Sequence, residues 1–420
     1  MRILLAGRGS QGDVYPYLAL AKELEKRGHT VTVSLPRLFE REAKDAELNY
    51  TLQAVDDIAG MVEGVPDTKD LLAWTQRVIK NQFEEFIPLL ERQDVLVAAN
   101  TEFAAPSIAE YCGKPLVRTA FGPFIPGRRI PPPVFPLAEP NPIIRPALLW
   151  AMLNIGLNMM VKKTVNQQRR ALGMEDIRDQ AEHAPANGDN FLLYSRYLGE
   201  TDPDWNYRWG IGGYCFNDIF PYDGKLQRQF LDFVKKDRRP TIFFTLGSCN
   251  TEKRDLFAQR LFEICREQNY KLVVGCGWWK VGVHLHTGEH LFLLDKAIPH
   301  AFIFPHVDAV IHHGGSGTTH SAARAGKPQM AFPLIIDQFY WAHRVYKLGI
   351  GPKGANIGRI SKAELKKKVL DLVTNQSYRE KAAHLGALVR GENGLQAACE
   401  RIEASRSPVE REEGTAAVNE

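Results

Sequence analysis

Short apolar runs alternate with longer segments of helical periodicity along the 420 residues of this chain. The first pair shows the pattern, because residues 3–6 are an unbroken apolar run and residues 15–27 carry leucine and alanine at helical spacing before Gly28. Apolar runs of this length between helices are typical of parallel strands that are buried on both faces. We therefore predict an α/β fold, since parallel strands are joined by helical crossovers.

The remaining runs fall into two groups that are separated by a polar, turn-rich stretch at residues 217–239. The other predicted strands share an apolar and often β-branched composition; they are residues 30–35, 95–99, 115–119, 240–247, 272–276, 291–294, 309–311 and 329–332. A chain of this length is expected to form two or three domains. We predict two Rossmann-like domains, residues 1–220 and 221–404, which face each other across a cleft, with a disordered tail at residues 405–420.

Charge and cysteine usage exclude several functional classes. The 53 basic and 49 acidic side chains leave a net charge of +4 with no basic stripe, so a nucleic-acid partner has little support. The six cysteines are scattered without a Cys-x-x-Cys pair, which argues against a disulfide framework or a metal cluster. The apolar start of the chain is too short for a signal-peptide core, and we expect a cytoplasmic protein.

The most informative segment is residues 310–319, Val-Ile-His-His-Gly-Gly-Ser-Gly-Thr-Thr. A buried strand ends in a glycine loop, and a helix is expected to begin near Ser316. Such a loop presents unpaired backbone N–H groups and the positive end of the helix dipole to an anion. Hydroxyl groups follow at Thr318 and Thr319, and a histidine at the strand end can donate to a phosphate oxygen. The pattern predicts a diphosphate site that requires no metal.

A carboxylate and an amide, Asp337 and Gln338, follow the next predicted strand, residues 329–332. Side chains of these two types are suited to bidentate hydrogen bonds with neighbouring sugar hydroxyls. Phosphate donors at one strand end and sugar-binding groups at the next indicate a site for a nucleotide sugar.

A second glycine loop, residues 7–12, matches G-x-G-x-x-G between a strand and a helix. A dinucleotide-binding enzyme would carry an acidic residue at the end of the second strand, but that strand is followed by Pro36 and Arg37. Binding of NADP, with Arg37 on the 2′-phosphate, remains an alternative, although it leaves the loop at residues 312–319 unexplained.

These motifs resemble the UDP-glycosyltransferases of the GT-B fold, and most closely the bacterial natural-product and sterol-type glucosyltransferases. The resemblance covers nearly the whole chain and is most specific at residues 9–14, 312–319 and 337–341. It implies that His313 contacts the β-phosphate and that Asp337 and Gln338 hold the hexose. The diphosphate contacts that it implies in the glycine loop are His313, Gly315, Gly317 and Thr318, and Ser248, after the strand that ends in Gly247, matches a second phosphate contact.

Two positions depart from the plant members of this family, which carry a tryptophan on the uracil and a glutamate on the ribose. The corresponding residues here are Asp295 and Ser321. Backbone groups near Ile298, or the indole of Trp278 or its neighbour Trp279, are the substitutes that we consider for binding the base. Packing in the core is the alternative interpretation for the tryptophan pair.

In the resemblance the first glycine loop, with Ser10 and Gly12, lines the acceptor side of the cleft. Inversion at an anomeric carbon requires a general base that takes the proton of the attacking hydroxyl, and Asp13 is the candidate. A free aspartate has a pKa near 3.9, a helix N-terminus lowers it, and an apolar, water-poor pocket raises it. The alternative is that Asp13 only caps a helix that begins near Val14.

Three other histidines near these motifs have plainer interpretations. His300 and His306 flank the donor loop and are expected at solvated positions. His320 lies on the helix after the loop, where packing or solvent exposure is the default.

The sequence thus predicts an inverting, metal-independent glycosyltransferase without a cofactor. It would move glucose or a similar hexose from a UDP-sugar to a hydroxyl of a hydrophobic acceptor such as a sterol, a lipid or an aromatic natural product. A nucleotide-sugar epimerase and a non-catalytic binder of apolar ligands are the alternatives. The proline-rich loop at residues 121–146 and the apolar helix at residues 143–161 also indicate transient peripheral contact with a membrane, although a helix packed on the core would look the same.

Overall fold

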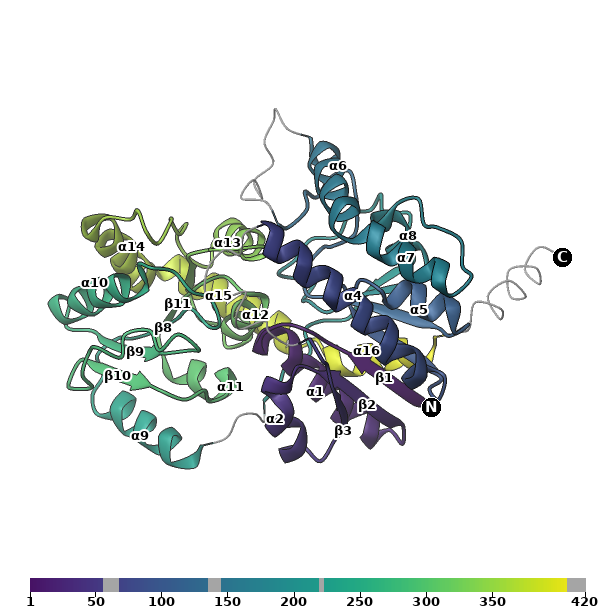
Figure 1. Ribbon diagram of the computed structural model, residues 1–420. Coiled ribbons are helices and arrows are strands. Elements are labelled where there is room, and N and C mark those ends of the chain that lie inside the picture. Colours follow the sequence, from purple (N-terminus) through teal and green to yellow (C-terminus); the bar gives the residue numbers. More distant parts are fainter. Residues whose placement is uncertain (56–67, 135–144, 219–222, 406–420) are drawn as a thin grey trace.

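The computed structural model describes residues 1–55, 68–134, 145–218 and 223–405. These residues form two α/β halves, each with its own parallel sheet, as Figure 1 shows. The prediction of an α/β protein with two Rossmann-like domains is confirmed. The expected tail beyond Ser405 and part of the loop at residues 121–146 lie outside the described residues.

The first half contains a sheet of seven parallel strands in the order β3-β2-β1-β4-β5-β6-β7. The strands are β1 (Arg2–Ala6), β2 (Thr30–Leu35), β3 (Asn49–Leu52), β4 (Val95–Ala99), β5 (Leu116–Ala120), β6 (Asp189–Leu192) and β7 (Trp209–Ile211). The helices of this half are α1 (Gln11–Lys26), α2 (Glu40–Asp45), α4 (Thr68–Leu90), α5 (Ala105–Tyr111), α6 (Pro146–Leu157), α7 (Lys163–Ala171) and α8 (Gln180–Ala186), with a short 3₁₀ helix at Arg37–Phe39 and a π-helical turn at Asn158–Lys162.

Helices cover both faces of this sheet, which is why its central strands are apolar throughout. In β1, Ile3 and Leu5 face the cluster that α1 forms with its neighbours, whereas Leu4 and Ala6 face the cluster of α4, α5 and α7. Side chains alternate between the two faces of a strand, so a strand that is covered on both sides has no polar face.

The second half repeats the plan with five parallel strands in the order β10-β9-β8-β11-β12. The strands are β8 (Thr241–Thr245), β9 (Lys271–Gly275), β10 (Leu291–Leu294), β11 (Ala309–His312) and β12 (Gln329–Ala331). The helices are α9 (Gly224–Lys235), α10 (Arg254–Glu267), α11 (His300–Ile303), α12 (Ser316–Arg324), α13 (Gln338–Lys347), α14 (Lys362–Thr374), α15 (Gln376–Arg390) and α16 (Gly394–Glu403), with a 3₁₀ turn at Phe304–His306.

The two halves share one hydrophobic cluster. It joins the loops that follow β5 and β6 to helices α12, α13 and α15, with Tyr194 and Trp341 in T-shaped contact at a centroid distance of 5.6 Å. Burial of apolar surface from both halves in one cluster stabilises their relative placement.

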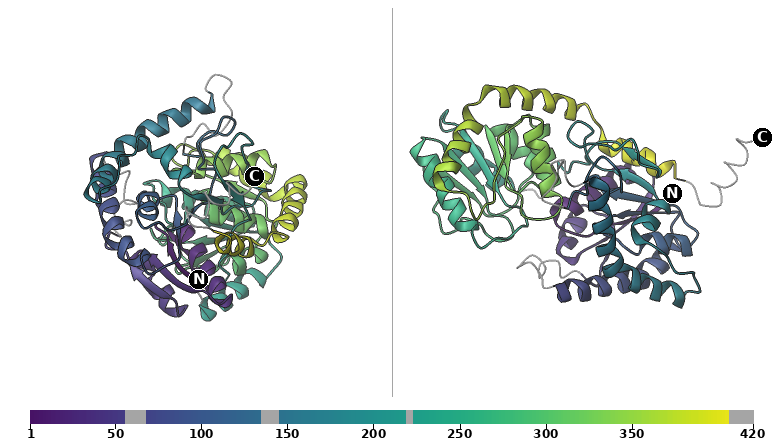
Figure 2. Two further views of the ribbon diagram at one scale, coloured as in Figure 1. Left: turned by 90° about the vertical axis from the view of Figure 1, so that its right-hand side faces the viewer. Right: turned by 90° about the horizontal axis from the view of Figure 1, so that it is seen from above.

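The last helix, α16, departs from the predicted domain boundaries. Residues 221–404 were assigned to the second domain, but α16 packs on the first half, with Ala398, Cys399 and Ile402 in the same core cluster as α1. The His29 ring and the Arg27 guanidinium reinforce this contact by pairing with Glu403 at 2.9 and 3.1 Å. Figure 2 shows the chain returning along α15 and ending on the N-terminal half.

Replacing Ile402 by alanine tests whether α16 stabilises the first half. The side chain is buried against α1, so Ile402→Ala should lower the free energy of unfolding by about 2–4 kcal/mol, through lost burial and the cavity left behind. The measurement is urea unfolding monitored by circular dichroism. Glu400→Ala, an exposed position on the same helix, is the control and should change stability by less than about 0.5 kcal/mol. Equal stability of the two variants would contradict the role given to α16.

Candidate functional site

The strand order of both sheets places the predicted motifs at their topological switch points. In the first sheet the order reverses between β1 and β4, and in the second it reverses between β8 and β11. The loops that leave adjacent strands there run to opposite faces of the sheet, which opens a crevice at the carboxyl edge where ligands bind. Asp13 follows β1, Ser248 follows β8, and His313 follows β11.

Helix α12 begins directly after the glycine loop, as predicted. Its N-cap is Gly315, which has no side chain to cap the helix, and no acidic residue lies in the first turn. The first amides of a helix have no intrahelical partner, so these groups and the positive end of the dipole are left for an anion. The hydroxyl of Thr319 is used inside the helix, donating to the Gly315 carbonyl at 2.9 Å.

His312 fixes the shape of the turn after β11. Its Nδ1 accepts from the Gly314 amide at 3.0 Å, and its Nε2 therefore donates to Oε1 of Gln329 at 2.9 Å. Gly314 has a φ of +89°, a conformation that a residue with a Cβ rarely adopts. His312 and Gly314 together fix the path of the chain after β11.

His313 is buried and carries an unsatisfied nitrogen. Burial lowers the pKa of the imidazole to about 4, and a hydrogen bond with the Thr245 backbone opposes that shift. The ring is therefore neutral at pH 7, and its Nδ1 has no hydrogen-bond partner within the part of the chain that the structure describes. Both neighbouring loops make room for the ring with glycine: a Cβ on Gly247 would lie 2.9 Å from Cε1 of His313, and a Cβ on Gly315 would overlap Nε2. A buried nitrogen without a partner is costly, which is the state expected of a group that awaits a ligand atom.

Asp13 lies in the first turn of α1, but it is not the N-cap. The helix begins at Gln11, earlier than predicted, because Ser10 is the N-cap and Asp13 is the third helical residue of a capping box. Oδ2 of Asp13 accepts from the Ser10 amide at 2.8 Å and from the Ser10 hydroxyl at 3.1 Å. Burial raises the pKa of the Asp13 carboxyl, and the hydrogen bonds from Ser10 oppose the rise. Among the described residues no hydrogen bond involves Oδ1, so this oxygen is available to accept a proton or a hydrogen bond from a ligand.

The N-termini of α1 and α12 meet at the junction of the two halves. A Cβ added to Gly317 would lie 3.7 Å from the Cα of Gly12, so the donor loop and the acceptor loop are in direct contact. Asp13 and Asp337 are also close, since the charge of Asp13 raises the pKa of Asp337. The fold therefore brings Asp13, Asp337 and the α12 N-terminus together around one point.

Asp337 and Gln338, at the start of α13, have different surroundings. Burial, and then the charge of Asp13, raise the pKa of the Asp337 carboxyl to about 7, while a hydrogen bond from the Trp341 indole lowers it. Gln338 is buried, and its Oε1 accepts from the amides of Leu334 and Ile335 at 2.8 and 3.1 Å. Asp337 thus keeps an oxygen for a ligand, whereas the Gln338 carbonyl oxygen is occupied in holding its own loop.

The other predicted contacts are spread around this junction. Ser248 is half-buried, and its carbonyl accepts from the Trp279 indole at 2.9 Å. Trp279 packs on the core of the second half, whereas Trp278 packs against the core cluster of the first half. The Ile298 side chain is buried in the second half, so only its backbone is suited to contact a base. The use of Trp278 or Ile298 for the base stays a prediction.

Sequence reasoning missed two neighbours of the site. Cys249 is buried, and its Sγ accepts from Nε2 of Gln338 at 2.9 Å, which ties the loop after β8 to the start of α13. His300, expected at a solvated position, is stacked on Phe304 with a centroid distance of 4.5 Å. Burial, followed by the effect of His313, lowers the pKa of His300 to about 4. The i, i+4 spacing of His300 and Phe304 on one helical turn was the available signal.

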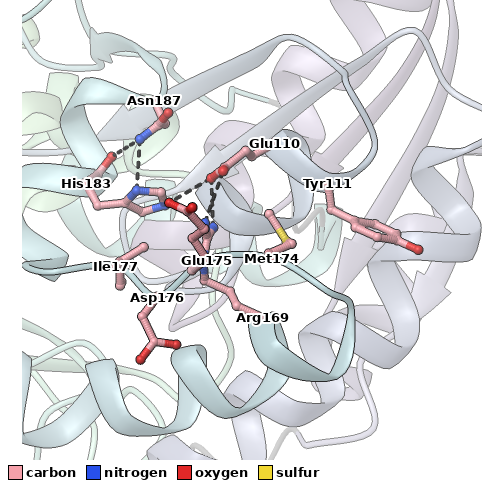
Figure 3. Close-up of a pocket in the computed structure, with 9 residues that line it drawn as sticks. All are labelled: Glu110, Tyr111, Arg169, Met174, Glu175, Asp176, Ile177, His183 and Asn187. Atoms are coloured by element: carbon pink, nitrogen blue, oxygen red, sulfur yellow. Dashed lines mark hydrogen bonds and ion pairs between the residues drawn. The ribbon is translucent and has the colours of Figure 1, made fainter.

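A hollow of about 560 Å³ lies away from this junction, between α5, α7 and α8 (Figure 3). Several of its polar groups are already paired: the Arg169 guanidinium binds Glu110 through two contacts of 2.7 and 3.0 Å, and the His183 and Asn187 side chains meet at 2.9 Å. These contacts tie the helices together and leave the junction as the candidate active site. Among the described residues no group of three or more His, Cys, Asp or Glu side chains is arranged to hold a metal ion.

Comparison with known proteins agrees with this geometry. Residues 3–127 match the N-terminal domain of glycosyltransferase family 28, and residues 292–393 match the C-terminal domain of erythromycin biosynthesis protein CIII-like proteins. Glycosyltransferase GtfE of Amycolatopsis orientalis is 30% identical over 84% of this chain and 85% of its own length. Sterol 3-beta-glucosyltransferase UGT80B1 of Arabidopsis thaliana is 23% identical over 97% of this chain but only 68% of its own length. The crystal structure of the glycotransferase of kitacinnamycin superposes with a TM-score of 0.73 at 17% identity, covering 96% of this chain and 98% of its own.

Two doubly wound sheets with an anion-binding helix N-terminus at the junction define a two-domain nucleotide-sugar enzyme. The chain belongs to the GT-B glycosyltransferases, as its identity and coverage with GtfE show. This membership favours sugar transfer over the epimerase, the NADP enzyme and the non-catalytic binder that the sequence left as alternatives.

The pKa of Asp337 predicts how stability depends on pH. The carboxyl holds its proton in the folded protein up to about pH 7, whereas an unfolded aspartate releases it near pH 3.9. The folded state therefore binds more protons than the unfolded state in this window, so stability falls as the pH rises from about 4 to 7. Asp337→Asn should reduce this decline, as measured by thermal unfolding at pH 4.5, 6 and 7.5; the raised pKa of Asp13 leaves a remainder. Asp232→Asn, at an exposed position on α9, should leave the wild-type decline in place. A decline in Asp337→Asn as large as in the wild type would contradict the shift.

Proposed function

We propose that this protein is an inverting, metal-independent glycosyltransferase that moves glucose from UDP-glucose to a hydroxyl group of a hydrophobic acceptor. The observation that carries the proposal is the pairing at the junction of an uncapped helix N-terminus with a carboxylate from the opposite half. The helix N-terminus can bind a diphosphate, and the carboxylate can accept the proton of a hydroxyl group.

The donor would lie with its diphosphate on the N-terminus of α12. The Nδ1 atom of His313 has no hydrogen-bond partner among the described residues, and in the neutral tautomer that carries its proton on Nδ1 the ring would donate to a phosphate oxygen rather than to the Thr245 backbone. The amides that follow Gly315, with the hydroxyls of Thr318 and Ser248, would take further oxygens. Charge grows on the diphosphate as the bond to the sugar breaks, and preorganised donors of this kind stabilise it without a metal ion.

The sugar would lie between the two carboxyl groups. Asp337 would accept from the hexose hydroxyls, as the family resemblance implies, and Gln338 would hold the loop that positions Asp337. On the other side, the free Oδ1 of Asp13 would take the proton of the acceptor hydroxyl as the acceptor oxygen attacks C1. A raised pKa improves the match between Asp13 and a base that works near neutral pH. Attack from the Asp13 side and departure of the diphosphate toward α12 would take place on opposite faces of the sugar, as inversion requires.

The nature of the acceptor is supported by relatives of two kinds, one named as a sterol 3-beta-glucosyltransferase and one as a vancomycin aglycone glucosyltransferase. A hydrophobic, hydroxylated acceptor is common to both groups. A cytoplasmic location is supported by the six cysteines, which are all free and five of them buried, as expected in a reducing compartment.

Replacing Asp13 by asparagine tests the mechanism. Asparagine still accepts the Ser10 hydrogen bonds, so Asp13→Asn should fold and bind UDP as the wild type does. It cannot take a proton, and the rate of transfer should fall by about 10²- to 10⁴-fold. The assay combines glucose transfer to a panel of sterols and aromatic aglycones with calorimetric titration of UDP. EDTA should leave wild-type transfer unchanged. Full turnover by Asp13→Asn, or loss of transfer in EDTA that a divalent metal restores, would contradict the mechanism.

Helix α6 supports the further proposal that the protein docks on a membrane. The helix is apolar on two sides: Leu149 and Trp150 pack inward, while the opposite face is exposed. The exposed residues follow one helical stripe; they are Leu148, Met152, Ile155 and Met159, with exposed fractions of 56, 53, 62 and 74%. A helix that is apolar all round is normally covered. Nothing among the described residues covers this stripe, and α6 lies at the outer edge of the first half in Figure 1.

Charge favours an anionic bilayer as the occupant of this stripe. Residues 145–163 contain three basic residues and no acidic one, and the basic residues flank the apolar face at its two ends. A helix of twelve residues is about 18 Å long, too short to cross a bilayer. In agreement, no helix in the described part of the chain meets the length and hydropathy needed to span a membrane. Such a helix would lie in the interface, where a lipid-dissolved acceptor is within reach.

Flotation with lipid vesicles tests this surface. Wild-type protein should float with phosphatidylcholine vesicles that contain 30% phosphatidylglycerol, and less so in 0.5 M salt. The double variant Leu148→Ser with Ile155→Ser should partition about tenfold less well, through lost burial of two apolar side chains. Leu38→Ser with Leu256→Ser, which removes two equally apolar exposed side chains elsewhere, is the control. Wild-type protein that stays at the bottom of the gradient, or equal flotation of both variants, would contradict membrane docking at α6.

A further inference from the structure

Two crossings of the chain between the halves converge at one residue, Tyr214. The first crossing follows β7 and passes through Tyr214, which is buried. The second joins α15 to α16, and a Cβ added to Gly394 on that crossing would lie 2.5 Å from the Tyr214 carbonyl oxygen. Gly213, immediately before Tyr214, has a φ of +109°. The two crossings thus pack backbone to backbone, and Tyr214 is fixed from both.

The Tyr214 side chain reaches the point where the helix N-termini meet. Its hydroxyl donates to the Gly12 carbonyl at 3.3 Å, in the acceptor loop beside Asp13. The same hydroxyl would lie 2.9 Å from a Cβ added to Gly317, in the phosphate loop. The hydroxyl therefore lies between the two loops and touches both.

His320 holds the ring of Tyr214 from the side of α12. The two rings are stacked, with centroids 4.7 Å apart and an angle of 18° between their planes. The Trp341 indole makes a T-shaped contact with the His320 ring, also at a centroid distance of 4.7 Å. Nδ1 of His320 donates to the Ser316 carbonyl at 2.7 Å, and Nε2 accepts from the Ser195 amide at 3.1 Å. Both bonds require a neutral ring with the proton on Nδ1, and burial lowers the pKa of His320 to about 4.

These contacts form a continuous path from the acceptor loop to the phosphate loop. It runs from Gly12 to the Tyr214 hydroxyl, across the stacked rings to His320, and on to Ser316 at the start of α12. From His320 the path also reaches Ser195, in the loop that follows β6 in the first half. Tyr214, His320, Ser316 and Ser195 are buried, and the contacts of Tyr214 with Gly12 and of His320 with Ser195 join residues that are far apart in the sequence.

We propose that Tyr214 and His320 are positioning residues that hold the acceptor loop, and with it Asp13, at the distance from the phosphate loop that transfer requires. Neither side chain takes part in the chemistry. The two residues instead determine how often Asp13 and the bound donor are correctly aligned. A small misplacement of reacting groups lowers the rate strongly. The expected effect on the rate rests on the proposed transfer reaction, whereas the coupling between the acceptor loop and the phosphate loop does not.

The variant Tyr214→Phe keeps the stacked ring and removes only the hydroxyl. It should melt within about 1 °C of the wild type and bind UDP equally well, whereas kcat for transfer should fall about three- to tenfold, the effect of one neutral hydrogen bond. The KM for donor should stay within about twofold. Tyr111→Phe, on an exposed tyrosine far from the junction, should match the wild type in every respect. Wild-type kcat in Tyr214→Phe would overturn the proposal.

Two replacements of His320 separate its two hydrogen bonds. In His320→Gln the side-chain oxygen lies where Nε2 was and can still accept from Ser195, whereas in His320→Asn the side-chain amide lies where Nδ1 was and only the bond to Ser316 survives. If His320 couples the halves through Ser195, glutamine should retain more of kcat than asparagine at equal stability. The reverse order would place the effect inside α12 alone and would overturn the coupling.

Amide hydrogen exchange tests the coupling without any substrate. In Tyr214→Phe the amides of residues 11–15, at the start of α1, should exchange at least about threefold faster than in the wild type, while those of α5 stay unchanged. Unchanged exchange at residues 11–15 would overturn the inference even if transfer is slowed. If the wild-type protein transfers no sugar, the proposed function fails, and the exchange measurement still decides on Tyr214.

Discussion

The close approach of two helix N-termini is the constraint on which the rest of this structure depends. Each N-terminus carries unpaired amides and partial positive charge, so bringing two of them together is unfavourable unless negative groups lie between them. Helix α1 meets this need internally, through the carboxylate of Asp13 in its capping box. Helix α12 has a glycine N-cap and no acidic residue in its first turn. The junction is thus electrostatically incomplete on the α12 side, and a diphosphate would complete it.

The same approach explains the carboxyl groups at the junction. Asp13 and Asp337 come from different halves; burial raises the pKa of both carboxyl groups, and the charge of Asp13 raises that of Asp337 further. A ligand with hydroxyl groups between them would lower this repulsion, since each carboxylate gains a donor. The shared hydrophobic cluster around Tyr194 and Trp341 keeps the halves together, so the strained arrangement at the junction persists without a ligand.

The sequence predicts the central part of this fold well because the signal there is local. Strands such as β1, β4, β8 and β11 are covered on both faces, so they read as unbroken apolar runs. In the first sheet β3, β6 and β7 were not predicted, and in β6 the reason is a polar group buried by a distant partner: Asp189 pairs with Arg401 of α16. The return of α16 to the first half was missed for the same reason, since an amphipathic helix does not reveal which core it covers.

The same distinction between local signals and distant contacts applies to the site. His313 and the loop around Gly315 could be predicted because a strand, a glycine turn and a helix are contiguous in the chain. The N-cap could not be assigned correctly, since both Ser10 and Asp13 are capping residues and only the geometry distinguishes them. Tyr214 and His320 are 106 positions apart, and their stacking depends on how the halves meet, which no local pattern records.

Calorimetric titration of UDP and of uridine, both in EDTA, tests the central claim most directly. If the N-terminus of α12 and the neutral His313 bind the diphosphate, UDP should bind at least about 100-fold more tightly than uridine, and His313→Asn should lose most of that difference. Equal affinity for the two ligands, or tight binding of UDP only when a divalent metal is present, would contradict the account.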